Sequence, residues 1–319
     1  MKNYKYHPKP LFEQRMKKLL EEKEDYEKFS EIIHKKPLNY IRANTIKISP
    51  EELKERLEKK WEIEQLFPEH PEIVLVKSQL LPGEIGKSEE HLLGYYYVQE
   101  LSSMMPILAL QPNPNEVILD LCASPGSKTT QITAKMNNTG TIIANDKDIG
   151  RISILNANLE RIGVTNTITT RMPGDILSKK LEKLNFKFDK ILVDAPCSGE
   201  GNLRSNPETF IMWNINMIKK LSGLQKKLLC SVIPLLKPQG ELIYSTCTHA
   251  PEENEEVVDF ALNQFPDLEL ENINLPIKCR EGITKWENKI FLNELKKCAR
   301  IYPQDNNTEG FFIAKMRKN

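Results

Sequence analysis

The amino-acid sequence predicts an α/β protein in which a doubly wound, mostly parallel sheet follows a smaller α+β domain. From Val117 onward, short strand-like runs alternate with longer helical runs, and this alternation is typical of parallel sheets with helices on both faces. Before Tyr95 the helical runs are rich in charge and the strand-like runs are isolated. A chain of 319 residues has room for both units. We therefore predict an amino-terminal domain over residues 1–92 and a larger domain over residues 93–319.

The elements follow from apolar periodicity and from helix-ending residues. In the first domain we expect helices over 11–36 and 49–60, and strands over 40–48 and 72–77. A further helix is expected from residue 96 until the two prolines of QPNPNE end it. In the second domain we expect strands over 117–121, 141–146, 167–172, 190–195 and 241–247, and later in LELENI and FFIAKM. Helices are expected from about Gly126, from the end of the 141–146 strand to Ile162, over 214–236 and over 252–264.

Composition narrows the class of protein. Hydrophobic residues make up 39% and charged residues 28%, as in ordinary soluble proteins. No apolar stretch approaches the about 20 residues of a membrane span, and the start MKNYKYHPKP has no signal-peptide core. The six cysteines form no C-x-x-C pair, so we expect free thiols, no metal site and a cytoplasmic location. Residues 1–60 hold 16 basic against 11 acidic residues, which suits either a nucleic-acid contact or solvated helices.

The first strand–loop–helix unit of the larger domain indicates a cofactor. DLCASPGSKT (Asp120–Thr129) follows a buried strand and opens a helix, whose first N–H groups are free to bind a ligand. The segment lacks both the Gly-Lys-Ser/Thr of a P-loop and the three glycines of a dinucleotide fingerprint. Asp146 ends the next strand, where a carboxylate accepts hydrogen bonds from ribose hydroxyls, although it could instead cap the following helix. A nucleoside cofactor without pyrophosphate remains, and S-adenosylmethionine fits best.

Two cysteines follow strand-like runs. Cys197 lies in KILVDAPCSGEG and Cys247 in ELIYSTCTHAPEENE. Loops that follow parallel strands meet at one edge of the sheet, where α/β proteins bind ligands. The two thiols could therefore face one pocket and act as nucleophiles. The alternative is that both are buried cysteines that pack as small apolar side chains.

Three segments together resemble the motifs of the Sun (Fmu) family of RNA cytosine-5 methyltransferases. They are DLCASPGSKT, DAPCSGEGNLRSNPE and YSTCTHAPEENE, in that order. YIRANTIK, GYYYVQELSSMMP and RIYPQDNNTEGFFIAKM extend the resemblance to residues 38–319. The short chain is most similar to the compact archaeal enzymes that modify tRNA. The resemblance implies a Rossmann-like class I methyltransferase sheet with an RRM-like amino-terminal RNA-binding domain. It also implies S-adenosylmethionine as the cofactor and RNA, in particular tRNA and not DNA, as the substrate.

The resemblance also implies roles for individual residues. Cys247 attacks carbon 6 of cytosine, and Cys197 assists release of the product. Asp194 hydrogen-bonds the cytosine edge, and Lys128 is a cation near the cofactor or the base. The expected cofactor contacts are Cys122, Ala123, Ser124, Pro125, Gly126, Ser127, Lys128, Asp146, Arg151, Asp175 and Asp194. The expected RNA contacts are Arg42, Asn44 and Arg204.

Some questions stay open at this point. His249 follows the TCT motif, and we expect a solvent-facing loop histidine there, although it could tune the thiol. An rRNA cytosine-5 methyltransferase fits the same motifs. So does a catalytically silent RNA-binding or ribosome-assembly factor, although such a factor would be expected to lose a cysteine or the cofactor loop.

Overall fold

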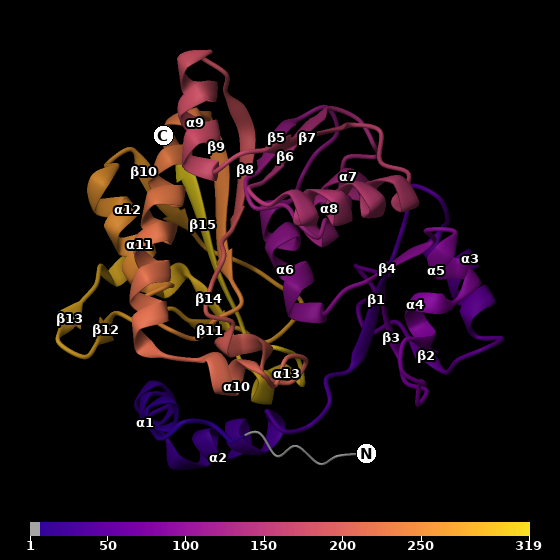
Figure 1. The fold of residues 1–319 in the computed structure, drawn as a ribbon, viewed down its shortest axis with the longest axis horizontal. Helices are drawn as coiled ribbons and strands as arrows, with labels where there is room; N and C mark the ends of the chain where they lie inside the picture. The colour runs from indigo at the N-terminus through magenta and orange to yellow at the C-terminus, as the bar shows by residue number, and fades with distance from the viewer. Residues whose placement is uncertain (1–6) are drawn as a thin grey trace.

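The computed structural model describes residues 7–319, so the first six residues of the predicted amino-terminal domain lie outside it (Figure 1). The helices of eight or more residues are α1 (Pro10–Leu19), α2 (Lys23–Ile32), α3 (Pro50–Leu57), α6 (Leu101–Leu110), α7 (Ser127–Lys135), α8 (Ile149–Ile162), α9 (Gly174–Lys183), α11 (Ile215–Val232) and α12 (Glu255–Gln264). Shorter helices are α4 (Glu84–Lys87), α5 (Glu89–Leu92), η1 (Glu200–Asn202), α10 (Thr209–Met212), η2 (Ile233–Leu235), η3 (Asn293–Lys297) and α13 (Pro303–Asn306). Among residues 7–319, no helix has the length and apolar character needed to cross a membrane.

The large sheet has nine strands and is mostly parallel at its centre. It contains β5 (Val117–Asp120), β6 (Thr141–Asp146), β7 (Thr167–Arg171), β8 (Phe188–Asp194), β9 (Leu236–Thr246), β10 (Leu268–Glu271), β11 (Arg280–Glu281), β14 (Ala299–Ile301) and β15 (Phe311–Lys318). The order is β11-β14-β15-β9-β8-β5-β6-β7, with β10 paired to β15. Pairings from β9 to β7 are parallel, and β15 is antiparallel to β9. The predicted doubly wound sheet is therefore confirmed, with an antiparallel strand inserted near one edge.

Helices cover both faces of this sheet, because alternate residues of each central strand point to opposite sides. Leu119 of β5 packs in one apolar cluster with α9, α11 and α12. Its neighbour Ile118 packs in a second cluster with α6, α7 and α8. Figure 1 shows these two groups of helices on opposite sides of the strands. The carboxyl ends of β5, β6, β8 and β9 remain at one edge, where their loops meet.

A small antiparallel sheet forms a separate layer. Its order is β2 (Ile63–Glu64), β3 (Ile73–Val76), β1 (Asn39–Ala43) and β4 (Tyr96–Val98), and α3 packs on one face through Leu53 and Leu57. The helix that we expected from residue 96 begins only at Leu101. The preceding residues pair with β1 instead, because the pattern of Tyr96–Val98 fits a sheet surface as well as a helix. The small sheet therefore extends past residue 92.

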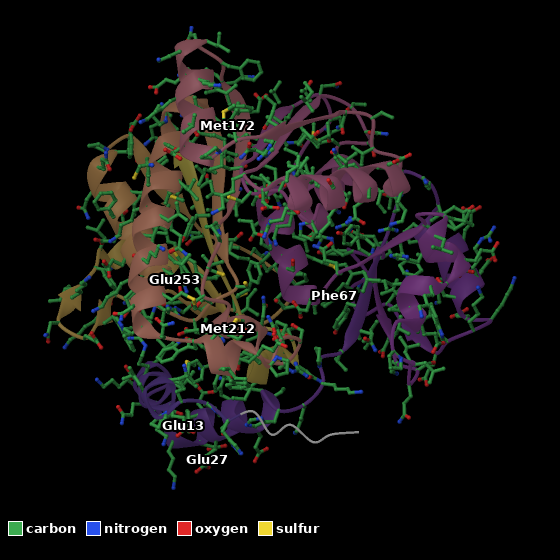
Figure 2. The ribbon with its side chains drawn as sticks, in the orientation of Figure 1. Glu13, Glu27, Phe67, Met172, Met212 and Glu253 are labelled. Carbon is green, nitrogen blue, oxygen red and sulfur yellow. The ribbon has the colours of Figure 1, made fainter. Side chains whose placement is uncertain are left out.

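The first two helices do not pack on the small sheet. Phe12 of α1 and Phe29 of α2 belong to an apolar cluster with Leu203, Trp213 and Tyr302 of the large domain. Figure 1 places both helices beside α10 and α13, and Figure 2 shows Glu27 pointing away from that contact. The segment that we predicted as one amino-terminal domain is thus divided between two places in the fold.

Candidate active site

A cavity of about 490 Å³ opens at the carboxyl edge of the parallel strands. Its walls come from the loop after β5, the ends of β8 and β9, the start of β15, and residues 37–40 and 97–100 around the small sheet. Its size lies within the usual range for small-molecule sites. Two parts of the chain that are distant in sequence therefore enclose one space.

The loop after β5 forms one wall of this cavity. Gly126 ends it with a φ of 102°, and a Cβ there would lie 2.9 Å from Leu155 Cδ1, so the turn into α7 requires glycine. Asp120, at the end of β5, accepts a hydrogen bond from Thr129 Oγ1 at 2.7 Å. Its other oxygen, Oδ1, has no partner among the described residues, and burial raises the pKa of Asp120 to about 7. A cavity of this size beside a free helix start and an unpartnered carboxyl oxygen fits S-adenosylmethionine, which brings an amino group.

Asp146 and Arg151 together hold this loop in place. Arg151 Nε donates to Asp146 Oδ2 at 2.9 Å, and Arg151 Nη2 donates to the Ser124 carbonyl at 2.7 Å. Ser124 Oγ donates in return to the Arg151 carbonyl at 2.9 Å. The helix cap that was the alternative for Asp146 belongs to Asp148, which accepts from the Arg151 N–H. Arg151 therefore positions Asp146 and the loop.

Asp175 is not brought to the cavity. It lies in the first turn of α9, where its carboxylate pairs with Lys227 of α11 at 2.7 Å. The hydrogen bond from Lys227 holds the pKa of Asp175 below its usual value. Its predicted contact with the cofactor stays a prediction that this geometry does not favour.

Lys128 and Asp194 form an ion pair at the wall of the cavity. Lys128 Nζ lies 2.7 Å from Asp194 Oδ2, 3.1 Å from Ser103 Oγ and 5.0 Å from the centroid of the Phe311 ring. Ser245 Oγ donates to the other oxygen, Asp194 Oδ1, at 2.7 Å. Lys128 is buried while Asp194 is partly exposed. The carboxylate is therefore fixed on both sides and presented to the space in front of it.

The two cysteines meet at the same edge. Cys197 Sγ and Cys247 Sγ lie 3.1 Å apart, although 50 residues separate them in the chain. Contact with Cys247, burial and the nearby Glu253 carboxylate raise the pKa of the Cys197 thiol well above its usual value. Cys197 therefore remains protonated at neutral pH, and its S–H can donate to Cys247 Sγ. Burial also raises the pKa of Cys122, which makes that third cysteine a poor nucleophile.

The three expected RNA contacts need correction, because all three side chains are buried and bonded within the protein. Arg42 donates to the Ser127 carbonyl and to Thr130 Oγ1, both at 2.8 Å, and also bonds Gln99. Asn44 Nδ2 donates to the carbonyls of Gly94 and Ile162 at 2.7 and 2.8 Å. These two residues join the small sheet to α7 and α8.

Arg204 holds the segment before β1. It donates to the carbonyls of Lys35 and Lys36 at 3.1 and 2.7 Å, and to the Thr308 carbonyl at 2.7 Å. Residues 37–40, which follow that segment, line the cavity. The guanidinium thus shapes the cavity rim, while the side chains of Lys35 and Lys36 are exposed.

The expectation of a solvent-facing His249 is also wrong. His249 is 2% exposed, and its ring stacks on the Tyr302 ring with centroids 5.0 Å apart and makes a T-shaped contact with the Phe29 ring. Burial lowers its pKa to about 3, so the ring is neutral and acts in packing. Its apolar partners come from the two ends of the chain, and no local sequence signal marked them.

The fold and the site together define a Rossmann-like methyltransferase that uses S-adenosylmethionine. A model of the 16S rRNA methyltransferase RsmB/F family matches residues 107–317, and a model of the N-terminal domain of 16S rRNA methyltransferase RsmF matches residues 9–101. The chain therefore belongs to the RsmB/F family of RNA methyltransferases, which the sequence motifs had indicated.

Among curated relatives, the chain is 43% identical to the tRNA (cytosine(49)-C(5))-methyltransferase of Pyrococcus abyssi, over 97% of this chain and 98% of that protein. It is 38% identical to ribosomal RNA small subunit methyltransferase F of Psychromonas ingrahamii, over 87% of this chain but 56% of that protein.

Two solved structures from Pyrococcus horikoshii share the fold over nearly the whole chain. A methyltransferase homolog superposes with a TM-score of 0.83 at 36% identity, covering 97% of this chain and 95% of that one. NSun6 with SFG, an analogue of S-adenosylmethionine, superposes with a TM-score of 0.79 at 26% identity, covering 96% and 97%.

Proposed function

We propose that the protein methylates carbon 5 of cytosine in tRNA through a covalent bond between Cys247 and carbon 6 of the base. The observation that carries this proposal is the 3.1 Å contact between the Cys247 and Cys197 sulfurs at the edge of the cavity. The Asp194–Lys128 pair and the loop after β5 line the same cavity. Nucleophile, base-binding carboxylate and cofactor wall are therefore within one site.

Similarity supports tRNA as the substrate class. The Pyrococcus abyssi tRNA enzyme matches this chain over almost the whole length of both proteins. The rRNA methyltransferases F extend well beyond the match, because the chain spans little more than half of their length. An rRNA substrate remains the second candidate, since the family models carry that description.

The chemistry follows from what each side chain can do. Carbon 5 of cytosine is a poor nucleophile until the Cys247 thiolate adds to carbon 6, which moves an electron pair toward carbon 5 and N3. Asp194, held by Lys128 and Ser245, hydrogen-bonds the base edge at N3 as that atom takes up a proton. Carbon 5 then attacks the electrophilic methyl group that the sulfonium of S-adenosylmethionine would supply, and the methyl–sulfur bond breaks to leave a neutral thioether. Loss of the carbon-5 proton to water then allows the bond between carbon 6 and sulfur to break.

Cys197 has the complementary role in release. It stays protonated, for the reasons given above, and lies beside Cys247 Sγ. Its S–H can donate a hydrogen bond to the departing Cys247 thiolate and so stabilise the leaving group. We assign attack to Cys247 and release to Cys197.

The remaining site residues bind the cofactor and the RNA. The loop residues Cys122–Ser127 would hold the methionine part of the cofactor, and Asp146, whose carboxylate is held by Arg151, would accept hydrogen bonds from its ribose hydroxyls. The RNA reaches the cavity with its target base out of the stack. Its backbone passes the rim formed by residues 35–40, where Lys35 and Lys36 are exposed.

Incubation with S-adenosylmethionine tritiated on the methyl group tests this function. Unmodified tRNA and small-subunit rRNA are offered in parallel, and bisulfite sequencing locates the product. We expect label in tRNA at cytosine carbon 5. Label in rRNA alone selects the second candidate, and no label in any RNA supports a catalytically silent RNA-binding factor.

Two variants then separate the cysteine roles. Cys247→Ala is expected to abolish transfer, because the attacking sulfur is gone. Cys197→Ala is expected to accumulate an RNA–protein adduct that survives a denaturing gel. An adduct that forms without Cys247 and requires Cys197 would reverse the assignment.

A further inference from the structure

Asn202 touches the sulfur that we propose attacks the base, yet the motif DAPCSGEGNLRSNPE, in which it lies, indicated no role for it. It ends the short helix η1, and its side-chain Nδ2 lies 3.1 Å from Cys247 Sγ. The residue is half-buried and lines the cavity. An amide N–H therefore points at a thiol at the edge of the substrate space.

The backbone fixes this contact. The Gly201 N–H donates to the Cys247 carbonyl at 2.9 Å, and the Gly310 N–H donates to the Gly201 carbonyl at 2.9 Å. A Cβ on Gly201 would lie 2.2 Å from the Gly310 carbonyl oxygen. Only glycine therefore allows the backbone segments around Gly201, Cys247 and Gly310 to approach so closely. Asn202 follows directly, which gives its side chain a set distance from Cys247.

A thiolate at this position needs hydrogen-bond donors. The cation of Lys128 is already paired with Asp194 at 2.7 Å. The Glu253 carboxylate near Cys197 has a negative charge, which would repel a thiolate. Cys247 Sγ has two groups at 3.1 Å, the thiol of Cys197 and the amide of Asn202. An amide stays neutral and keeps its N–H at every working pH. Hydrogen bonds to a charged acceptor are roughly twice as strong as neutral ones.

We propose that Asn202 is a catalytic residue, which donates a hydrogen bond to Cys247 Sγ and thereby stabilises and aims the thiolate before it attacks. This proposal rests on the proposed function for the identity of the attacking sulfur. The donor–sulfur contact itself is independent of the RNA substrate.

Alkylation of Cys247 by iodoacetamide tests the contact without RNA or cofactor. The rate is followed from pH 6 to pH 10 by mass spectrometry of the peptide that carries Cys247, in the wild type, Asn202→Ala and Asn202→Asp. Asn206→Ala is the matched control, because Asn206 is an exposed asparagine in the same loop. At pH 7 we expect alkylation to be about tenfold slower in Asn202→Ala. It should be slower again in Asn202→Asp, whose carboxylate replaces a donor with a charge of the same sign as the thiolate.

The pH dependence separates this role from a structural one. The Asn202→Ala rate should approach the wild-type rate at high pH, where the thiol ionises without help, and kcat/KM for RNA methylation should show the same displacement toward high pH. Asn206→Ala should follow the wild type. Equal alkylation profiles in all four proteins would overturn the proposal even if Asn202→Ala lost activity. Failure of the proposed function would look different, since the wild type would then transfer no methyl group while the alkylation rates still differed.

Discussion

Glu253 is a buried carboxyl beneath the cysteine pair, and removing its charge should stabilise the fold in a pH-dependent way. Glu253 Oε2 accepts hydrogen bonds from the Ser198 N–H at 3.0 Å and from Gln225 Nε2 at 2.8 Å, while Oε1 has no partner within residues 7–319. Figure 2 places Glu253 beside α11, and the side chain is fully buried. Burial, followed by the charge of Glu200, raises the pKa of Glu253 from 4.5 to about 7.

The direction and size of the effect follow from this pKa. Between pH 4.5 and 7 the folded protein keeps a proton that the unfolded chain has lost, so the free energy of unfolding falls as the pH rises. The decrease in the free energy of unfolding should reach about 3 kcal/mol above pH 7. Glu253→Gln keeps the two acceptor contacts on its oxygen and removes the ionisation. Relative to the wild type, its stability advantage should grow by about 2 kcal/mol between pH 5.5 and pH 8 and then level off.

Urea unfolding across this pH range measures the difference. Glu182→Gln, an exposed glutamate on α9, serves as the control and should show little change with pH. Two results would refute the reasoning. One is a gain in unfolding free energy for Glu253→Gln over the wild type that is the same at pH 5.5 and pH 8. The other is a Glu253→Gln protein that becomes less stable than the wild type as the pH rises.

Three further predictions concern the cavity and its rim. Lys128→Met removes the cation 2.7 Å from Asp194, and single-turnover methyl transfer should slow about a hundredfold; an unchanged rate would show that Asp194 does not need the pair. Arg42→Leu removes the buried hydrogen bonds that join β1 to α7, so urea unfolding should report a loss of about 3 kcal/mol, and full stability would contradict a joining role. Replacing Lys35 and Lys36 together by alanine should reduce the slope of log affinity for tRNA against log salt by about 2. The same slope as the wild type would place the RNA backbone elsewhere.

The sheet edge and the residues on it were predictable from the sequence. Asp146, Asp194, Cys197 and Cys247 each follow a run of apolar residues that is long enough for a strand. Strand ends are set by such local runs, and parallel strands must bring their carboxyl ends to one edge. The sequence therefore predicts the edge of the sheet at which the cavity lies.

The partners of the buried polar side chains could not be predicted in this way. Arg204 follows a motif loop. The sequence around such an arginine is the same whether it binds phosphate or backbone carbonyls. Arg42 and Asn44 bond to α7 and α8, which lie far along the chain. Asn202 went unnoticed because its role depends on the approach of Gly201 to Gly310, more than 100 residues apart.

The packing of α1 and α2 has a consequence for how the chain folds as it is made. Helices α1 and α2 pack against apolar residues between positions 203 and 302, and Asp25 pairs with Arg280 across 255 residues. Contacts of such long range form late and slow folding, because a large loop must close first. Phe29 packs against His249, two residues beyond Cys247. The loop that carries Cys247 is therefore packed by a side chain from far earlier in the chain, and this support can form only after residue 249 has been synthesised.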